Sequence, residues 1–430
     1  MRSDGGFLPR WTLKTGGAIM PDERLPAGQT LVAGFQHMVA MFGSTVLGPL
    51  LMGFDANVAV LFSGIATLIF FFATRGQVPS FLGSSFSFIA VVIAATGYAG
   101  AGAPNANIAV ALGGIIAAGA VYTAIGAIVH WAGHAWIERL MPPVVTGAVV
   151  AVIGLNLAPV AIKAVSANAV ATWIGLFTVL AVGLVACYAP GMARRLPILL
   201  GGLIAYVAYL IVANGAGLAP PIDFTAVAEA AWFGLPRFTA PVFDATAMVL
   251  IAPVAIVLVA ENLGHIKGIS AMTGRNLDPY LGRAFMGDGV ATMLSGSFGG
   301  PGVTTYAENM GVMAVTRIYS TLAFVFAALF AILLGFSPKF GAAIHTIPGP
   351  VVGGLSIVVF GLIAATGARI WVANKVDFAN VRNLIVAGVT LTVGAGDLAL
   401  SFGGFTLGGI GVATFGAIIL YALLREPPAD

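Results

Sequence analysis

The chain has 430 residues, of which 59% are hydrophobic and only 8% are charged. A soluble domain carries about a quarter charged residues, so this composition excludes a water-soluble fold. The net charge of +3 gives no reason to expect a nucleic-acid partner, because in a membrane protein the placement of Lys and Arg carries the information. The single Cys187 can form no intramolecular disulfide.

Residues 1–28 are rich in basic side chains and lack a short apolar run before a small-residue cleavage site. They are therefore expected to form a cytoplasmic tail and not a removed signal peptide. Fourteen apolar segments follow, some shorter than the roughly 20 residues that a straight spanning helix needs. In chain order the segments are 29–50, 58–74, 83–95, 108–130, 142–161, 171–188, 196–212, 246–265, 285–297, 304–316, 319–334, 348–366, 383–395 and 407–424.

The basic residues follow a one-sided distribution if all fourteen segments cross the membrane. Sixteen of the nineteen Lys and Arg residues then lie on the side of the two tails, and only Lys163, Arg237 and Lys339 do not. Cytoplasmic loops carry such an excess of Lys and Arg. The sequence therefore predicts a multi-pass protein of the cell inner membrane with both termini in the cytoplasm.

Internal repetition appears at a constant offset of seven segments. Residues 143–155 match residues 350–362 at seven of thirteen positions. Two shorter likenesses have the same offset: 64–67 with 289–292, and 84–86 with 304–306. An odd number of spans per repeat inverts the second copy, as in many transporters.

The repeat pattern divides the chain into five parts. We expect an all-α polytopic fold of about fourteen spans in two inverted seven-span repeats. The parts are an N-terminal tail (1–28), the first repeat (29–212), an extracytoplasmic loop (213–245), the second repeat (246–424) and a C-terminal tail (425–430).

Three acidic residues lie in apolar segments: Glu261, Asp288 and Glu308. A charged group at membrane depth costs at least a few kcal/mol and marks a functional site by default. A structural partner for a basic residue is the alternative. His265 lies four residues after Glu261, on the same helical face, so the two could relay a proton, although His265 could equally be an interfacial residue. His37 in the first segment is open to the same two interpretations.

The starts of the third and tenth segments are expected to be extended. Residues 84–88 and 303–306 are β-prone and alternating, and extended backbone at membrane depth is tolerated only where it is buried in protein or lines a cavity. Short β-strands there would pair and then turn into half-helices, whose N-terminal N–H groups point at a central site.

Such a site suits a flat heterocycle. A pyrimidine dione offers two ring N–H donors and two carbonyl acceptors; Glu261 and Glu308 can accept from the donors, and amides near Phe86 and Ala307 can meet the carbonyls. Phe86 could stack on the ring. These residues alone predict a small polar solute without naming it.

Residues 308–317, Glu-Asn-Met-Gly-Val-Met-Ala-Val-Thr-Arg, resemble the signature of the nucleobase–ascorbate transporter family. The resemblance extends over nearly the whole chain, including 36–37, 83–86, 260–265 and 304–309, and is greatest to the bacterial uracil permeases. It implies a core domain of spans one to four and eight to eleven, a gate domain of the remaining spans, elevator-type alternating access and a homodimer.

The resemblance also implies roles for individual residues. Glu261, Glu308, Phe86, Tyr306 and Ala307 would bind the base. His265 would support the proton site, and the supporting polar side chains would be those of His37, Ser85, Thr305 and Asn309.

Asp288 is a departure from part of the family, because some uracil transporters have an amide where purine-type members have an acid. Its presence leaves open whether Glu261 with His265 or Asp288 carries the proton. It also leaves open whether xanthine is accepted.

The predicted function is proton-coupled import of uracil by a protein embedded in membrane lipid. The alternative is an anion transporter of the related sulfate and bicarbonate fold, which two carboxylates facing the substrate disfavour. A passive channel is a further alternative, and its uptake of solute would not depend on a proton gradient. No hydrolase, zincin or phosphate-loop motif occurs, so we expect no enzyme, no cofactor and no metal.

Overall fold

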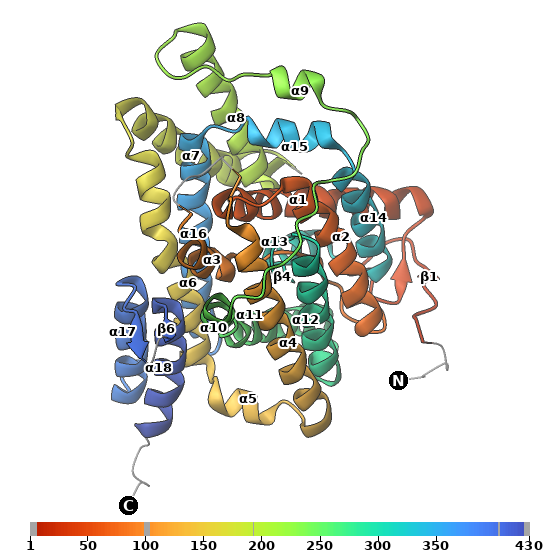
Figure 1. Ribbon diagram of the computed structural model, residues 1–430. Helices are drawn as coiled ribbons and strands as arrows, with labels where there is room; N and C mark the ends of the chain where they lie inside the picture. The colour runs from red at the N-terminus through yellow and green to blue at the C-terminus, as the bar shows by residue number, and fades with distance from the viewer. Residues whose placement is uncertain (1–6, 99–103, 192, 403–404, 425–430) are drawn as a thin grey trace, which may run out of the picture.

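The computed structural model describes residues 7–98, 104–191, 193–402 and 405–424. Helices dominate this part of the chain (Figure 1). Eight described helices are long and apolar enough to cross a membrane, and a ninth span results if α14 (Thr321–Gly335) and α15 (Pro338–His345), bent by 80°, count as one. The protein is thus a multi-pass membrane protein.

Each of the fourteen predicted apolar segments contains a helix. These are α1 (Ala27–Met52), α2 (Ala56–Ala73), α3 (Ile89–Thr96), α4 (Ile108–Ala132), α6 (Pro143–Val165), α7 (Ala169–Tyr188), α8 (Pro197–Leu210), α11 (Val254–Thr273) after the short α10 (Ala245–Ile251), α12 (Leu281–Ser297), α13 (Ala307–Thr316), α14, α16 (Gly349–Ala373), α17 (Val381–Ala395) and α18 (Gly409–Leu423). Short helices in the connections are α5 (Ala135–Leu140), α9 (Thr225–Glu229) and α15.

Helix ends follow local chemistry. The Asp55 side chain caps α2 by accepting from Val58 N at 3.0 Å, which satisfies one of the free N–H groups of a first turn. Gly53 ends α1 with φ 75°, a left-handed conformation that favours glycine. Pro253 lies between α10 and α11, where its missing N–H interrupts the helix.

Part of the predicted N-terminal tail packs against the helices. Strand β1 (Thr12–Leu13) pairs in parallel with β2 (Glu23–Arg24), and Ile19 forms a bridge to Ile318, just after α13. Asp22 forms an ion pair of 2.5 Å with Arg275, after α11. The polar composition of this segment gave no sign of these contacts.

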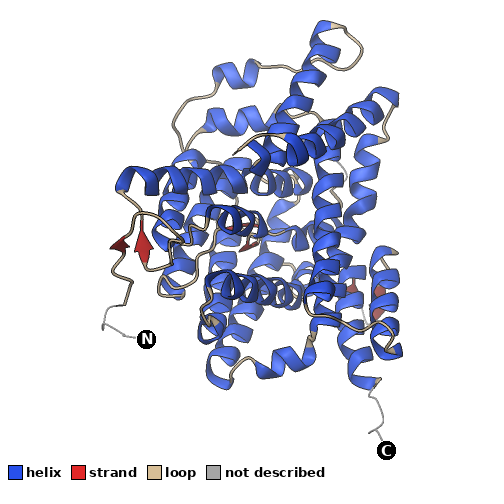
Figure 2. Cartoon of the chain, turned by 180° about the vertical axis from the view of Figure 1, so that it is seen from behind, coloured by secondary structure: helices blue, strands red, loops and turns tan. Residues whose placement is uncertain are grey.

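The helices pack in two sets. The first helix set contains α1 to α4 and α10 to α14, and the second contains α6, α7, α8, α16, α17 and α18. In Figure 1 the second set lies on the left, with the C-terminus, and α2, α12 and α14 lie on the right; Figure 2 shows the same separation from behind. Contacts between the sets are sparse and involve chiefly α1 with α8 and α16, and α6 with α3 and α11.

Two short strands meet inside the first set. Strand β3 (Leu82–Ser84) pairs antiparallel with β4 (Val303–Thr305). Thr67 of α2 accepts from Leu82 N at 2.9 Å, and Thr292 of α12 accepts from Val303 N at 3.2 Å. The two threonines come from the related tetrapeptides of the sequence, so each copy supports its own strand in the same way.

The predicted extent of the first strand was wrong. Residues 84–88 were expected to be extended, but Phe86–Phe88 form a 3₁₀ turn leading into α3. The Ser85 hydroxyl accepts from Ser87 N at 3.3 Å. This local side-chain bond favours a helix start over a longer strand.

Glycine permits close helix approach in both sets. A Cβ at Gly64 of α2 would meet the Ala328 carbonyl of α14, and a Cβ at Gly289 of α12 would meet the Gly119 carbonyl of α4. In the second set, Gly367 of α16 lies against α6. Small residues at such interfaces let backbones approach in membranes.

We expect Gly367→Ala to lower the free energy of unfolding by about 1–3 kcal/mol through overpacking. The added methyl group would lie 2.6 Å from Ala151 N and against the Gly147 carbonyl. Gly361→Ala, in the same helix, is the matched control because no described atom of a neighbouring element lies within 4 Å of its Cβ position. It should gain up to about 1 kcal/mol in helix propensity. Thermal unfolding in detergent measures both, and equal unfolding temperatures for the two variants would contradict this packing.

Candidate functional site

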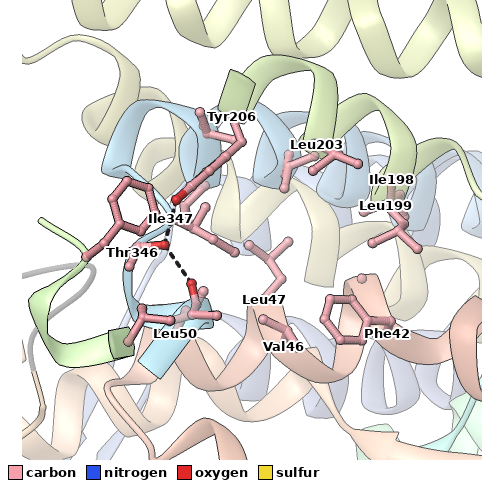
Figure 3. Close-up of a pocket in the computed structure, with 18 residues that line it drawn as sticks. Phe42, Val46, Leu47, Leu50, Ile198, Leu199, Leu203, Tyr206, Thr346 and Ile347 are labelled. Carbon is pink, nitrogen blue, oxygen red and sulfur yellow. Dashed lines mark hydrogen bonds between the residues drawn. The ribbon is translucent and has the colours of Figure 1, made fainter. Parts of the chain in front are cut away.

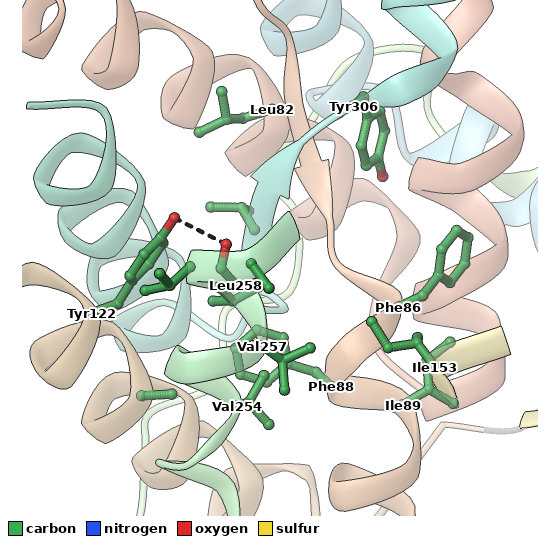
Figure 4. Close-up of a cluster of buried hydrophobic side chains, with 14 of the residues drawn as sticks. Leu82, Phe86, Phe88, Ile89, Tyr122, Ile153, Val254, Val257, Leu258 and Tyr306 are labelled. Atoms are coloured by element: carbon green, nitrogen blue, oxygen red, sulfur yellow. Dashed lines mark hydrogen bonds between the residues drawn. The ribbon is translucent and has the colours of Figure 1, made fainter. Parts of the chain in front are cut away.

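The site residues gather where α11 passes the β3–β4 pair and the two half-helices that follow it. Figure 4 shows the strands with Phe86 and Tyr306 on one side and Leu258 of α11 bonded to Tyr122 of α4 on the other. The strands place the starts of α3 and α13 beside one another, so residues about 220 positions apart in sequence share one region.

Glu261 and Glu308 are the two carboxylates of this region. Both side chains are half-buried. Ser87 donates to Glu261 Oε2 at 3.4 Å, and Ser44 of α1 donates to Glu308 Oε1. Glu261 is thus bonded to the turn that leads into α3, and Glu308 lies in the first turn of α13.

The two half-helices start with unused amides. Neither the Phe86 nor the Ala307 N–H donates a hydrogen bond within the described parts of the chain. First-turn N–H groups have no partner inside their helix, and they bind acceptor oxygens well. The site therefore combines two carboxylate acceptors with two backbone donors.

Phe86 lies at the boundary between the helix sets. Its side chain is 8% exposed, and its ring makes an edge contact with Phe360 of α16, with centroids 6.1 Å apart and planes at 84°. The nearly perpendicular planes make this an edge-to-face contact between the two helix sets.

Tyr306 is buried and its hydroxyl is occupied. It accepts from Thr45 at 3.1 Å and donates to the Ser84 carbonyl at 3.0 Å. A Cβ at Gly83 would lie 2.6 Å from both the Tyr306 and Thr45 hydroxyl oxygens. Glycine at position 83 therefore lets this tyrosine fasten β3 to α1.

His265 bonds to a strand and not to Glu261. Its Nδ1 lies 2.9 Å from Thr305 Oγ1 of β4, whereas Glu261 bonds to Ser87. No direct hydrogen bond joins His265 to Glu261 in the described part of the chain. Helical spacing puts their side chains on one face, but each is oriented by a different neighbouring element.

Asp288 belongs to a buried network that the sequence did not reveal. Asn262 Nδ2 donates to Asp288 Oδ2 at 2.7 Å and to the Tyr122 hydroxyl at 2.9 Å. Asn262 Oδ1 accepts from Thr305 at 3.3 Å. An amide beside an acid in an apolar helix was the available signal for Asn262, while Tyr122 stood in an apolar run without one.

His37 and Asn309 join α1 to α13. Asn309 Nδ2 donates to the His37 carbonyl at 2.9 Å and lies 3.1 Å from His37 Nδ1. Both residues are buried, and the His37 ring packs 4.3 Å from that of Phe324. They hold in place the half-helix that carries Glu308.

A cavity of about 280 Å³ lies at the boundary of the two helix sets (Figure 3). It is bounded by α1, α8, α9, α15 and α16, and none of the predicted site residues lines it. Its two polar side chains, Tyr206 and Thr346, bond to each other at 2.8 Å. The cavity is therefore apolar and separate from the carboxylates. In the described parts of the chain, no three His, Cys, Asp or Glu side chains are grouped to hold a metal ion.

Comparisons with known proteins agree with the sequence resemblance. A family model described as "Permease family" matches residues 28–402. The chain is 64% identical to "Putative pyrimidine permease RutG" of Escherichia coli (strain K12), covering 99% of this chain and 97% of that protein. It is 39% identical to the uracil permease of Bacillus caldolyticus, covering 94% of each, and 38% identical to the uracil permease of Escherichia coli (strain K12), covering 95% and 94%.

Solved structures share the fold at low sequence identity. The transmembrane domain of a cyanobacterial bicarbonate transporter, BicA, aligns with a TM-score of 0.62 and 19% identity over 92% of this chain and 97% of that one. The murine anion transporter Slc26a9 in its inward-facing state aligns with a TM-score of 0.65 and 13% identity over 96% and 69%. These likenesses concern the fold alone.

Proposed function

Because the chain belongs to the nucleobase–ascorbate transporter family of permeases, we propose that it imports uracil together with a proton. One observation carries the choice of substrate: Glu261 is bonded to Ser87 beside the free amide of Phe86, and Glu308 lies in the first turn of the half-helix that begins with the free amide of Ala307. Relatives 38–39% identical to this chain are named uracil permeases.

Uracil fits this set of groups in kind and number. Its two ring N–H groups can donate to the two carboxylates, its two carbonyl oxygens can accept from the two amides, and its face can stack on Phe86. An anion such as sulfate or bicarbonate would meet two carboxylates of its own sign. The likeness of fold to anion transporters therefore does not extend to this site.

Proton coupling is proposed from the acids at membrane depth. A protonated acid crosses the membrane without moving a bare charge, so a carboxyl group that binds the base only in one protonation state couples the two movements. Glu261, with His265 one turn away, is our first candidate for the coupling acid, and Asp288 is the second.

The architecture that we propose has fourteen spans in two inverted repeats, residues 29–212 and 246–424. The two threonines that support β3 and β4 favour it, and so do the glycine contacts, in which α2 packs on α14 as α12 packs on α4. The loop 213–245 would be extracytoplasmic, both termini cytoplasmic, and the working unit an inner-membrane homodimer.

In the proposed elevator mechanism the first helix set is a moving core and the second is a static gate. The sparse contacts between the sets and the apolar cavity on their boundary favour sliding, because few contacts would have to break. Phe86 would travel with the core and exchange its contact with Phe360 of the gate.

The first test of this proposal is ligand protection of the purified protein. Uracil at 100 times its dissociation constant should stabilise the protein by about 2.7 kcal/mol, which raises the unfolding temperature by a few degrees, whereas sulfate should not. A parallel measurement with xanthine tests the purine diones. Protection by sulfate without protection by uracil would overturn the assignment.

A further inference from the structure

A chain of four hydrogen-bonded side chains connects Asp288 with His265. It runs from Asp288 on α12 to Asn262 on α11, then to Thr305 on β4, and ends at His265 on α11. Asn262 and Asp288 are 0% exposed and Thr305 is 1% exposed, whereas His265 is half-buried. An acid without access to water is thus linked to an imidazole that keeps some.

The observed bonds fix the direction of donation along this chain. The Asn262 amide nitrogen donates to Asp288, so its oxygen must accept from the Thr305 hydroxyl. That hydroxyl has one proton, so Thr305 must accept from His265, and His265 Nδ1 carries a hydrogen. In this arrangement a neutral His265 has an unprotonated Nε2.

Protonation of Asp288 at Oδ2, the oxygen that faces Asn262, requires the opposite direction. A proton on Oδ1 would instead be a buried donor left unsatisfied, because Oδ1 has no hydrogen-bond partner in the described part of the chain. The acid O–H becomes a donor, the Asn262 amide turns its oxygen toward it, and the amide nitrogen then donates to Thr305. The Thr305 hydroxyl in turn donates to His265 Nδ1. Tyr122, which accepts from Asn262 and lies 3.3 Å from the Leu258 carbonyl, serves both arrangements because a hydroxyl can donate or accept.

We propose that Asn262 and Thr305 transmit the protonation state of Asp288 to the tautomer of His265 by reversing every hydrogen bond between them. One proton is taken up, at the Asp288 oxygen facing Asn262. At His265 the Nδ1–H bond breaks and its proton passes to water, while water gives a proton to Nε2. The ring therefore stays neutral. Asn262 and Thr305 are positioning residues in this scheme. The role of the scheme in transport rests on the proposed function.

The consequence for the site is a change at the accessible nitrogen of His265. Nε2 changes from an acceptor to a donor, one helical turn from Glu261 and on the same face. A donor there favours a ligand carbonyl oxygen or a charged Glu261. Affinity for the base would then depend on protonation of an acid that does not touch it.

Other titratable groups act on the two ends of the chain. Glu261 and Tyr122 act on the charge of Asp288, and Arg369 of α16 acts electrostatically on His265. Glu261 is the competing source of any response at His265, because it lies on the same helix. The experiment must therefore separate Asp288 from Glu261.

Nitrogen-15 NMR of labelled histidine in nanodiscs, without substrate, reads the tautomer directly. The His265 signals among the five histidines are those lost in His265→Gln. We expect a pH-dependent change from the Nδ1–H to the Nε2–H tautomer as pH falls, and imidazolium is separable because both nitrogens are then protonated. The change should be lost in Asp288→Asn and retained in Glu261→Gln.

Matched hydroxyl variants test the path between the two ends. Thr305→Val should abolish the change, and Thr305→Ser should restore it. Thr178→Val is the control, because within the described residues that buried hydroxyl bonds only to the Ile174 carbonyl of its own helix. If Thr305→Val fails to fold, Asp288→Asn against Glu261→Gln decides alone.

A single His265 tautomer at every pH, or an unchanged transition in Thr305→Val or Asp288→Asn, overturns the proposal. Because no substrate is present, these outcomes are independent of whether the protein binds uracil. Where it does, Thr305→Val should also flatten the pH dependence of the uracil dissociation constant, with Thr305→Ser restoring it.

Discussion

Glu261→Gln is expected to abolish the accumulation of uracil driven by a pH gradient while leaving weak binding of the base. The amide cannot take up and release a proton, but its oxygen can still accept one ring N–H. Loss of a hydrogen bond to a charged acceptor costs about 1.5–3 kcal/mol, or about 10- to 100-fold in affinity. Binding should weaken by that factor, whereas coupling should disappear.

Uptake of labelled uracil into proteoliposomes, with and without an imposed pH gradient, measures this difference. Glu308→Gln is the matched control because it is the same substitution in the same region, at the first turn of α13. The positive end of that half-helix favours a charged carboxylate, so Glu308→Gln should weaken binding and still respond to the gradient. Asp288 would become the coupling acid if Glu261→Gln still concentrated uracil.

The acids of the site could be predicted because each one breaks an apolar segment. Glu261, Asp288 and Glu308 stood out through the cost of a charge at membrane depth. Glu261 and Glu308 lie at the starts of the half-helices, and Asp288 is linked through Asn262 to Thr305 of β4. The related tetrapeptides at 64–67 and 289–292 contain Thr67 and Thr292, whose matching bonds to the strands appear only in the structure.

The partners of these acids could not be predicted, because they come from distant elements. Nothing near Glu308 in sequence indicates Ser44 of α1, and helical spacing suggested Glu261 as the neighbour of His265 when β4 supplies Thr305 instead. Nothing in the apolar sequence around Tyr122 distinguishes it from other tyrosines. Its bond to Asn262 depends on how α4 packs in the fold. Sequence thus indicates which groups are costly to bury, whereas the tertiary fold decides what satisfies them.

A disulfide between the two helix sets is expected to stop transport completely. Gly43 of α1 and Ile198 of α8 lie on opposite sides of the boundary, and a Cβ atom at Gly43 would lie 3.1 Å from Ile198 Cβ. A disulfide holds its Cβ atoms about 3.5–4.5 Å apart, so a shift of a few tenths of an ångström accommodates the bond, whereas sliding of one set past the other does not.

The experiment uses Gly43→Cys with Ile198→Cys in a Cys187→Ala background, since Cys187 is the single native cysteine. Oxidation should reduce uracil uptake to background, and a thiol reductant should restore it. Gly175→Cys with Val165→Cys is the control: those positions join α7 to α6 within the second set, with a Cβ separation of 2.8 Å. Its disulfide should leave uptake intact, because a static gate loses no movement when its own helices are joined. Undiminished uptake by the fully oxidised Gly43–Ile198 pair would show that transport proceeds without sliding at this boundary, and the substrate would then have to be exposed by movements within the first set.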